Sequence, residues 1–254
     1  MAVYKKKDKI AKKLQKDRQV IESSTTKEVF EGLDSGANKA EEWLLKNQKP
    51  LIIVLSALLI GVLGYMTYMR YVQEPAEVNA ANELAYPKAY FDQAQTNTTA
   101  ADSLYTMALD GADGKYGLVE IAKKYSNTKA GNLANYYAGI SYLKKKDYKQ
   151  AISFLNDFSS DDMMLNAVAN GSIGDAFANL GQLEDAFDYY KKAVSSNSNN
   201  YTTPFFLDKA AAIALSLGKN KEAEEFYTKI HIDFSKSAQA KDIKAKINQA
   251  KYAK

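Results

Sequence analysis

The sequence predicts an all-α chain in which one transmembrane helix near the N-terminus precedes a solenoid of helical hairpins. The first observation behind this fold class is the stretch from Leu51 to Met69, LIIVLSALLIGVLGYMTYM, which contains no charged residue. The second is the composition beyond it, which favours helix: Pro occurs there only at positions 75, 87 and 204, and no alternating Val/Ile/Thr run indicates a strand. The third is that three segments of the C-terminal half align with one another.

Residues 1–50 are predicted to form a basic cytoplasmic tail. They hold 12 Lys+Arg against 8 Asp+Glu and therefore carry the whole formal charge of +4. Between Thr26 and Leu45 the apolar residues follow a helical period, which indicates an amphipathic helix along the membrane surface. Because basic residues stay on the cytoplasmic side of a span, we expect the N-terminus on the cytoplasmic side of the membrane and the C-terminal domain on the opposite side.

Residues 51–71 are predicted to form the transmembrane helix. At about 1.5 Å per residue the apolar stretch would be roughly 28 Å long, close to the ~30 Å hydrocarbon core of a bilayer. Trp43 and Lys49 precede it, Tyr68 lies at its C-terminal end and Arg70 follows, as is typical of anchors at the two interfaces. The alternatives are a buried core helix and a cleaved signal peptide. The fifty residues before the stretch and the bulky residues after it favour a retained anchor.

Small residues recur within this predicted span at Ala57, Gly61 and Gly64. Such spacing lets a second membrane helix approach closely. Glycine is also common in membrane helices generally. The sequence leaves both explanations open.

Beyond the span, residues 72–78 are predicted to be a linker in which Pro75 ends the helix. Residues 79–131 are expected to form degenerate N-terminal helical repeats, with a Gly-Ala-Asp-Gly turn at 111–114. Residues 236–254 are expected to form a C-terminal capping helix from Ser237 to Lys251, which would keep the end of a solenoid soluble.

Residues 132–235 are predicted to form three helical hairpins of about 35 residues each. Small residues fall at equivalent positions in the first helices and again in the second helices, where two helices must cross closely. Aromatic residues recur at helical spacing in the second helices and fill the space between hairpins. The first-helix positions are Gly139, Gly174 and Ala211, the second-helix positions are Ala151, Ala186 and Ala223, and the turns fall at Lys146, Gly181 and Gly218.

This pattern of small, aromatic and alanine residues resembles the tetratricopeptide repeat (TPR) family. The usual proline at the repeat end is missing. In layout, with a basic tail, one span and a phrase such as ALDGADGKYGLVEIAKKYSNTKAGNLANYYAG, the chain is similar to the single-span, periplasm-facing TPR subunits associated with the bacterial Sec translocon. The resemblance implies a bacterial inner-membrane protein whose partners are translocon subunits, a membrane-anchored periplasmic chaperone of the peptidyl-prolyl isomerase type and client polypeptides.

No catalytic, cofactor-binding or metal-binding residues are predicted, and the chain is not expected to be an enzyme. It contains no cysteine, and the single histidine, His231, is expected to have a packing or surface role. No phosphate-binding loop or hydrolase motif occurs in the sequence. The aromatic and glycine pattern of an RNA-binding module is also missing, so nucleic acid is not expected as a partner.

In the TPR class the first helix of each hairpin lines the concave face, where protein partners bind. The residues that would line this face here are predicted from their spacing along the helix from the small crossing residues. They are Tyr136, Ile140, Lys144, Asp175, Asn179, Asp208 and Ala212. Their mixture of aromatic, apolar and oppositely charged groups suits a peptide or a protein surface. Two functions stay open: an ancillary subunit of the translocon and chaperone, or a scaffold or regulator of another envelope machine for secretion, cell-wall assembly or outer-membrane assembly.

Overall fold

The structure, a computed structural model, describes residues 15, 37, 40–196 and 198–253, and it divides into two compact units, Met1–Tyr68 and Met69–Lys254. Most of the predicted basic tail, including most of the amphipathic helix proposed for residues 26–45, lies outside the described residues. Residues 40–46 are helical. Elsewhere the described chain contains helices and turns without a strand, which confirms the all-α prediction.

The described part of the first unit ends in helix α3, Gln48–Tyr68, none of whose residues is buried. Among the described residues this is the helix that is long and apolar enough to cross a membrane, with a mean hydropathy of 2.2 over its most apolar window. Apart from neighbouring residues and the backbone of α3 itself, no atom lies within 4 Å of where a Cβ on Gly61 or Gly64 would stand, so this side of α3 is open. Ala57 is exposed as well.

The second unit begins with a π-helical turn, Met69–Gln73, followed by helix α4, Glu74–Thr96. Pro75 lies in the first turn of α4, so the prediction that it ends the helix is wrong, and much of the proposed linker is helical. The physical reason is that the amide groups of a first helical turn have no carbonyl partner within the helix. A proline there gives up no hydrogen bond and its fixed φ suits the helix.

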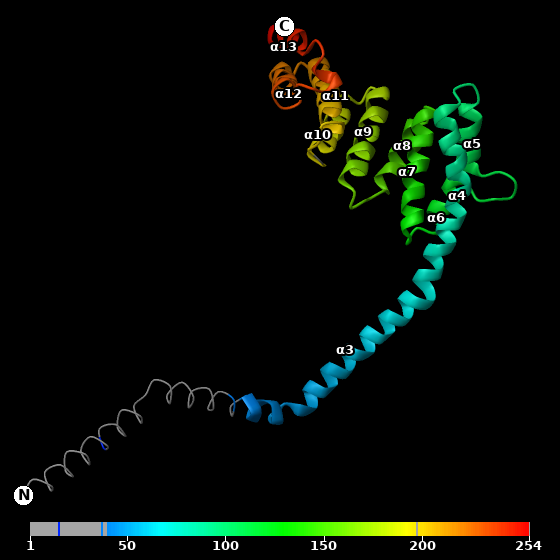
Figure 1. Ribbon diagram of the computed structural model, residues 1–254, viewed down its shortest axis with the longest axis vertical. Helices are drawn as coiled ribbons and strands as arrows, with labels where there is room; N and C mark the ends of the chain where they lie inside the picture. Colours follow the sequence, from blue (N-terminus) through cyan, green and yellow to red (C-terminus); the bar gives the residue numbers. More distant parts are fainter. Residues whose placement is uncertain (1–14, 16–36, 38–39, 197, 254) are drawn as a thin grey trace, which may run out of the picture. The chain divides into compact units, whose positions relative to one another are not determined.

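After α4, the helices of the second unit follow one another in short hairpins, and each packs against its neighbour in the chain (Figure 1). Their bounds are α5 Ala101–Asp110, α6 Leu118–Lys124, α7 Lys129–Lys144, α8 Tyr148–Asn156, α9 Met163–Asn179, α10 Leu183–Ser196, α11 Thr202–Ser216, α12 Asn220–Asp233 and α13 Ile243–Tyr252. The pairs α7/α8, α9/α10 and α11/α12 correspond to the three predicted hairpins.

The small residues predicted at the helix crossings lie where two helices meet. A Cβ on Gly139 would stand 2.5 Å from Cγ of Leu155, and a Cβ on Gly174 would stand 2.8 Å from two ring carbons of Tyr190. The same glycines also face the backbone carbonyls of Ala151 and Ala186. These distances are shorter than carbon–carbon contact allows, so the crossings require glycine at both positions.

The three turns within the hairpins share one geometry. Lys146, Gly181 and Gly218 all have positive φ angles, of 64°, 77° and 72°. In each turn the next amide donates back to a carbonyl five residues earlier, as Asp147 N does to Tyr142 O at 2.9 Å. This is the Schellman motif, in which glycine is favoured because the left-handed conformation costs it nothing.

Lys146 is therefore the strained member of the three turns, and Lys146→Gly should stabilise the second unit. The left-handed conformation costs a non-glycine residue about 1–2 kcal/mol, and the extra freedom of glycine in the unfolded chain offsets about 0.5–1 kcal/mol of the gain. We expect a net gain of roughly 0.5–1 kcal/mol, measured by urea unfolding. The reverse change Gly181→Lys should be destabilising, and a loss of stability in Lys146→Gly would contradict this account.

Two hydrophobic clusters form the core and meet at α9. One extends from Ala80 on α4 to Ile173, and the other contains Ala167 and continues to Ala250 on α13. Phe177 on α9 packs against both. The core is thus continuous along the solenoid, as expected when each hairpin buries its apolar face against the next.

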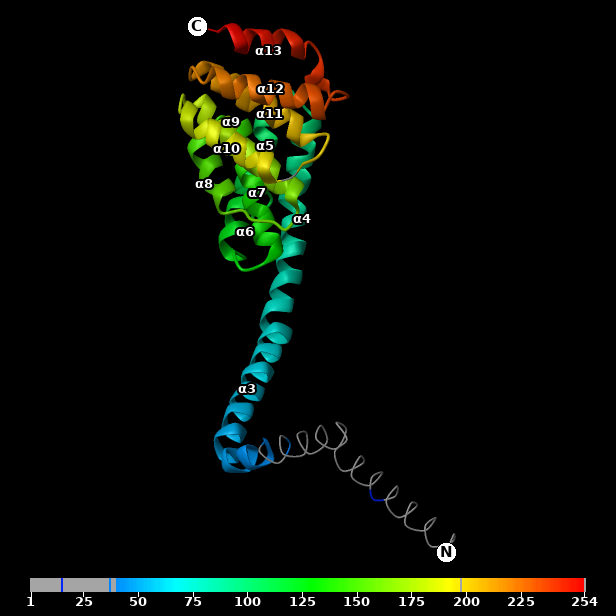
Figure 2. The ribbon, with the colours of Figure 1, turned by 90° about the vertical axis from the view of Figure 1, so that its left-hand side faces the viewer.

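The C-terminal end is covered by α13, which packs against α12 (Figure 2). Ile243 and Ala250 are buried, and Ile247 packs against the same cluster. The predicted start of this helix at Ser237 is wrong. A 3-10 turn, Ala238–Ala240, comes first, and Asp242 adopts a φ of 56°, so the α-helix begins only at Ile243.

Candidate partner-binding surface on the first helices

The predicted partner-binding residues occupy one side of α7, α9 and α11. On α11, Phe205, Asp208 and Ala212 follow one another at intervals of three and four residues and therefore share a helix face. We call this side of the three helices the first-helix face. It comprises Leu133, Tyr136, Ile140 and Lys144 on α7, Val168, Asp175 and Asn179 on α9, and Phe205, Asp208 and Ala212 on α11.

Asp175 is the most connected residue of this face. Its Oδ1 accepts a hydrogen bond of 2.5 Å from the hydroxyl of Tyr190 and another of 2.5 Å from Nζ of Lys209. Tyr190 comes from the second helix of the same hairpin, and Lys209 from the first helix of the next. The carboxylate therefore joins three helices, and its role in packing limits what it can offer a partner.

Asp208 repeats this arrangement one hairpin further along. Its Oδ1 accepts a hydrogen bond from Nζ of Lys246 on α13, and the two side chains are about one-third exposed. The two predicted carboxylates thus pair with lysines inside the solenoid. The sequence prediction missed both lysines, since they lie far from their partners in the chain.

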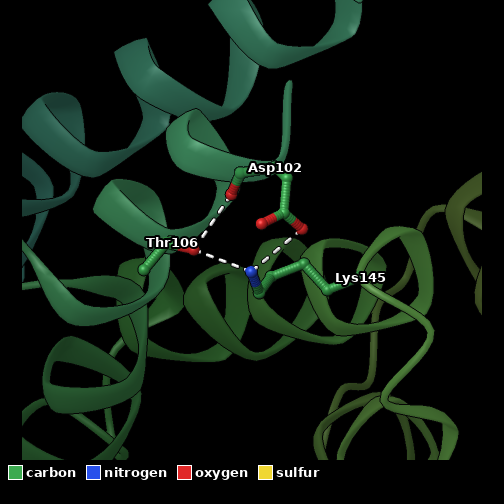
Figure 3. A network of polar contacts seen from close by, with 3 residues as sticks. All are labelled: Asp102, Thr106 and Lys145. Atoms are coloured by element: carbon green, nitrogen blue, oxygen red, sulfur yellow. Dashed lines mark hydrogen bonds and ion pairs between the residues drawn. The ribbon is translucent and has the colours of Figure 1, made fainter. Parts of the chain in front are cut away.

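A third pair connects the degenerate N-terminal hairpin to the first predicted repeat. Nζ of Lys145, at the end of α7, lies 3.1 Å from Oδ1 of Asp102 and 2.7 Å from Oγ1 of Thr106, both on α5 (Figure 3). Together with Asp175–Lys209 and Asp208–Lys246, it makes up what we call the junction ion pairs. Each joins a helix to one in a neighbouring hairpin or cap.

On α7 the predicted residues belong largely to the core. Ile140 is buried. Tyr136 is half-buried and its ring centroid lies 5.2 Å from that of Phe158, while the ring of Tyr137 lies 4.8 Å from that of Phe91 on α4. The centroids of the Tyr136 and Tyr137 rings are 5.6 Å apart, and both rings pack against the core. Only Lys144 of this group is exposed.

The accessible part of the first-helix face lies mainly on α9 and α11. Asn179 is exposed, and its Oδ1 accepts a hydrogen bond of 3.1 Å from the hydroxyl of Tyr148. Ala212 is exposed as well. Phe205 is 41% exposed, and Nζ of Lys209 lies 4.8 Å from the centroid of its ring.

Phe205 is the functional candidate that the sequence prediction missed. The signal was available, because Phe205 and Phe206 are adjacent on a helix and their side chains point in different directions, so one of them is expected to be the more exposed. Phe206 is the buried one, and a Cβ on Gly171 would stand 1.9 Å from its ring. Val168 and Leu133 occupy the positions equivalent to Phe205 in the two preceding hairpins, which gives the face an apolar row.

The buried tyrosines of the repeats have raised pKa values. Burial, with the hydrogen bond to Asp175 next in importance, raises the pKa of Tyr190 well above its usual range. Burial raises the pKa of Tyr227 to about 12, with the nearby carboxylate of Asp208 adding to the effect. Both hydroxyls therefore stay neutral in the folded protein at pH values where an unfolded tyrosine ionises.

These shifts predict that the second unit loses stability in base. An unfolded tyrosine ionises near pH 10, and the folded Tyr227 only near 12, so the unfolded state gives up its proton first and stability falls between these values. Below pH 10 the contribution is fully present. Tyr227→Phe should flatten the fall when urea unfolding is followed from pH 9 to 12. Tyr252→Phe, at a 73% exposed position, is the matched control, and equal slopes for all three proteins would contradict the prediction.

The second unit is a series of helical hairpins with small residues at the crossings and an accessible face on the first helices. This geometry is typical of one class of protein. Comparison with known families agrees. Residues 133–161 and 167–200 each match a family model described as tetratricopeptide repeat. These matches support a TPR protein, and TPR repeats imply a scaffold for protein–protein interaction. A search of curated proteins found no significant match.

Proposed function

We propose that the chain is a non-enzymatic interaction subunit anchored in the bacterial inner membrane by α3, with its TPR unit in the periplasm. The observation that carries this proposal is the presence, in one chain, of an unburied apolar helix and a TPR solenoid. An anchor confines the repeats to the membrane surface, where they meet partners at a raised effective concentration.

The partners that we propose are subunits of the Sec translocon, a membrane-anchored periplasmic chaperone of the peptidyl-prolyl isomerase type and translocated client polypeptides. The support is the resemblance in layout along the whole chain. The subunit would hold chaperone and translocon near each other, so that emerging polypeptides are received as they leave the pore. No nucleic acid and no cofactor enter this function.

The first-helix face suits such partners physically. Phe205 supplies an exposed aromatic group near the start of α11, of the kind that anchors protein interfaces, and Asn179 supplies a hydrogen-bonding group at the C-terminal end of α9. Lys144 adds a positive charge, while Asp175 and Asp208 are already paired with lysines. A surface with so little net charge favours a protein partner over an extended polyanion.

Affinity purification of the full chain from membranes in mild detergent tests the identity of the partners. We expect translocon subunits and a periplasmic chaperone to co-purify. Recovery of a different envelope machine, for secretion, cell-wall assembly or outer-membrane assembly, would replace this proposal with that of a scaffold or regulator of that machine.

A protease site introduced at Gly218 tests the topology. This glycine lies in the exposed turn between α11 and α12, so a cleavage sequence there is accessible in the folded unit. The excess of lysine before the span predicts that spheroplasts treated with protease are cut at this site, while a tag at residue 2 stays protected. Protection of the C-terminal part with loss of the N-terminal tag would reverse the proposed orientation.

A further inference from the structure

The last two residues of α6, the first residue of α7 and the residues between them carry a concentration of positive charge, and we call this segment the 123–129 connection. Residues 123–129, KKYSNTK, contain three lysines and no carboxylate. Lys123, Lys124 and Lys129 are all exposed. Nζ of Lys124 lies 4.0 Å from the centroid of the Tyr116 ring and donates to its hydroxyl at 2.9 Å. The TPR pattern does not require this run, since it lies before the matched repeats.

Hydrogen bonds fasten this connection to the end of the π-helical turn and to the first turn of α4. Nε2 of Gln73 donates to the carbonyl of Asn127 at 2.8 Å. Both carboxylate oxygens of Glu77 accept from the backbone amide of Lys129, at 3.1 and 3.0 Å. The three lysines therefore have a fixed position relative to Gln73 and Glu77.

Gln73 lies close in the chain to the end of the apolar helix. Residues 69–73 form a π-helical turn, and at about 1.5 Å per helical residue these five residues advance no more than about 8 Å. The polar layer of a bilayer adds roughly 5–8 Å on each side of the hydrocarbon core, and charges act over a further ~8 Å at physiological salt. If α3 spans the membrane as proposed, the 123–129 connection is held within reach of the lipid headgroups.

The carboxylates near this point leave the lysines in excess. Glu74 pairs with Arg70 at 2.7 Å. Glu77, which accepts from the backbone amide of Lys129, and the exposed Glu120 keep their two negative charges against the three positive charges of the connection. Tyr71 is 76% exposed and Val72 53% exposed, so the same end of the second unit also offers an aromatic and an apolar side chain. Lysine beside tyrosine is the composition that settles at a membrane interface.

We propose that the connection 123–129 docks onto the anionic phosphates of the bilayer in which the chain is anchored. This inference rests on the proposed transmembrane role of α3. Its consequence is that the TPR unit does not swing freely from its anchor, because the headgroups hold the α4 end of the unit at the surface by electrostatic attraction.

Depth-dependent quenching in vesicles tests the docking with the full chain. Since the protein has no cysteine, one fluorophore can be attached through Asn127→Cys, where the hydrogen bond to Gln73 uses only the backbone carbonyl. A second protein carries the label at the exposed Asn200 before α11. The vesicles contain phosphatidylcholine with or without phosphatidylglycerol, and the quencher is a lipid with a spin-labelled headgroup.

We expect the label at residue 127, and not the label at 200, to be quenched when phosphatidylglycerol is present. Replacing Lys123, Lys124 and Lys129 by glutamine should lower the docked population by roughly fivefold per lysine, and added salt should act in the same direction. A control with the same loss of charge replaces Lys149, Lys221 and Lys244, which lie on α8, α12 and α13, and should leave the quenching unchanged.

Flotation of the same vesicles separates the two proposals. If the chain floats but the label at 127 is quenched no more than that at 200, or equally without phosphatidylglycerol, the docking is overturned and the anchor stands. If the chain does not float with any vesicle, the anchor is overturned and the docking with it.

Discussion

Gly174→Leu is expected to lower the unfolding free energy of the second unit by more than about 2 kcal/mol. A Cβ at this position would already stand 2.8 Å from two ring carbons of Tyr190 and 3.3 Å from the carbonyl of Ala186. Tyr190 cannot easily retreat, because its hydroxyl donates to Asp175 and its ring stacks on Phe206 with 6.4 Å between centroids. Leucine must therefore push α9 and α10 apart and disturb the core at the middle of the solenoid.

Thermal and urea unfolding of the full chain in detergent measure this effect. Ala212→Leu is the control, because it adds a leucine to an exposed position of the neighbouring first helix. Gly174→Ala should fall between the wild type and Gly174→Leu, since a single methyl group already meets the Tyr190 ring. An unchanged unfolding curve for Gly174→Leu would mean that the two helices do not cross there.

Truncation of Phe205 together with Asn179 to alanine is expected to release partners from the first-helix face. An exposed aromatic anchor that becomes buried in a complex typically contributes about 2 kcal/mol or more, which is roughly a thirtyfold change in affinity. Both side chains are accessible in the free protein, so the fold should survive. The measurement is the retention of co-purifying proteins in a pull-down, with circular dichroism to confirm folding.

The matched control is Ile232→Ala on α12, a second helix, where the side chain is 69% exposed. Tyr136→Ala is a poor test of binding, because Tyr136 packs against Phe158 and its loss would damage the core. If the Phe205/Asn179 variant retains its partners while deletion of residues 51–69 releases them, the membrane helix is the binding element and the first-helix face is not.

The parts of the fold that could be predicted from the sequence are those in which the same residue types recur in each hairpin. Gly174 and Ala186 recur with the hairpins, and their spacing alone indicated a close crossing, which the 2.8 Å approach to Tyr190 explains. The turn at Gly218 was similarly visible, because glycine favours the left-handed conformation found there. Each of these signals depends on a residue type that few alternatives can replace.

The errors arose where a residue has two local roles. Pro75 breaks a helix interior but suits a first turn, and the sequence does not say where a turn of helix begins. Asp242 has a positive φ, so the α-helix begins only after it. Asparagine and aspartate tolerate this conformation but do not require it, so the sequence does not indicate it. Boundaries of this kind are decided by tertiary contacts, such as the burial of Ile243 against α12.

The candidate site was predicted less well than the fold. The repeat pattern predicted which helix face Asp175 and Asp208 lie on. It did not predict their pairing with Lys209 and Lys246, because such an ion pair depends on how closely two side chains from different hairpins approach each other. Phe205 was overlooked although its neighbour Phe206 gave the clue. Whether this face binds a partner is the part that no pattern in one sequence can decide, since TPR scaffolds serve many proteins.

The junction ion pairs have a mechanical consequence. Asp102–Lys145, Asp175–Lys209 and Asp208–Lys246 join residues that are 43, 34 and 38 positions apart, so each one fastens successive layers of the solenoid across its length. A load that pulls neighbouring hairpins apart must break these pairs as well as the hydrophobic contacts of the core. Because the pairs are partly exposed, their strength depends on salt. The force needed to stretch the solenoid should therefore fall as ionic strength rises.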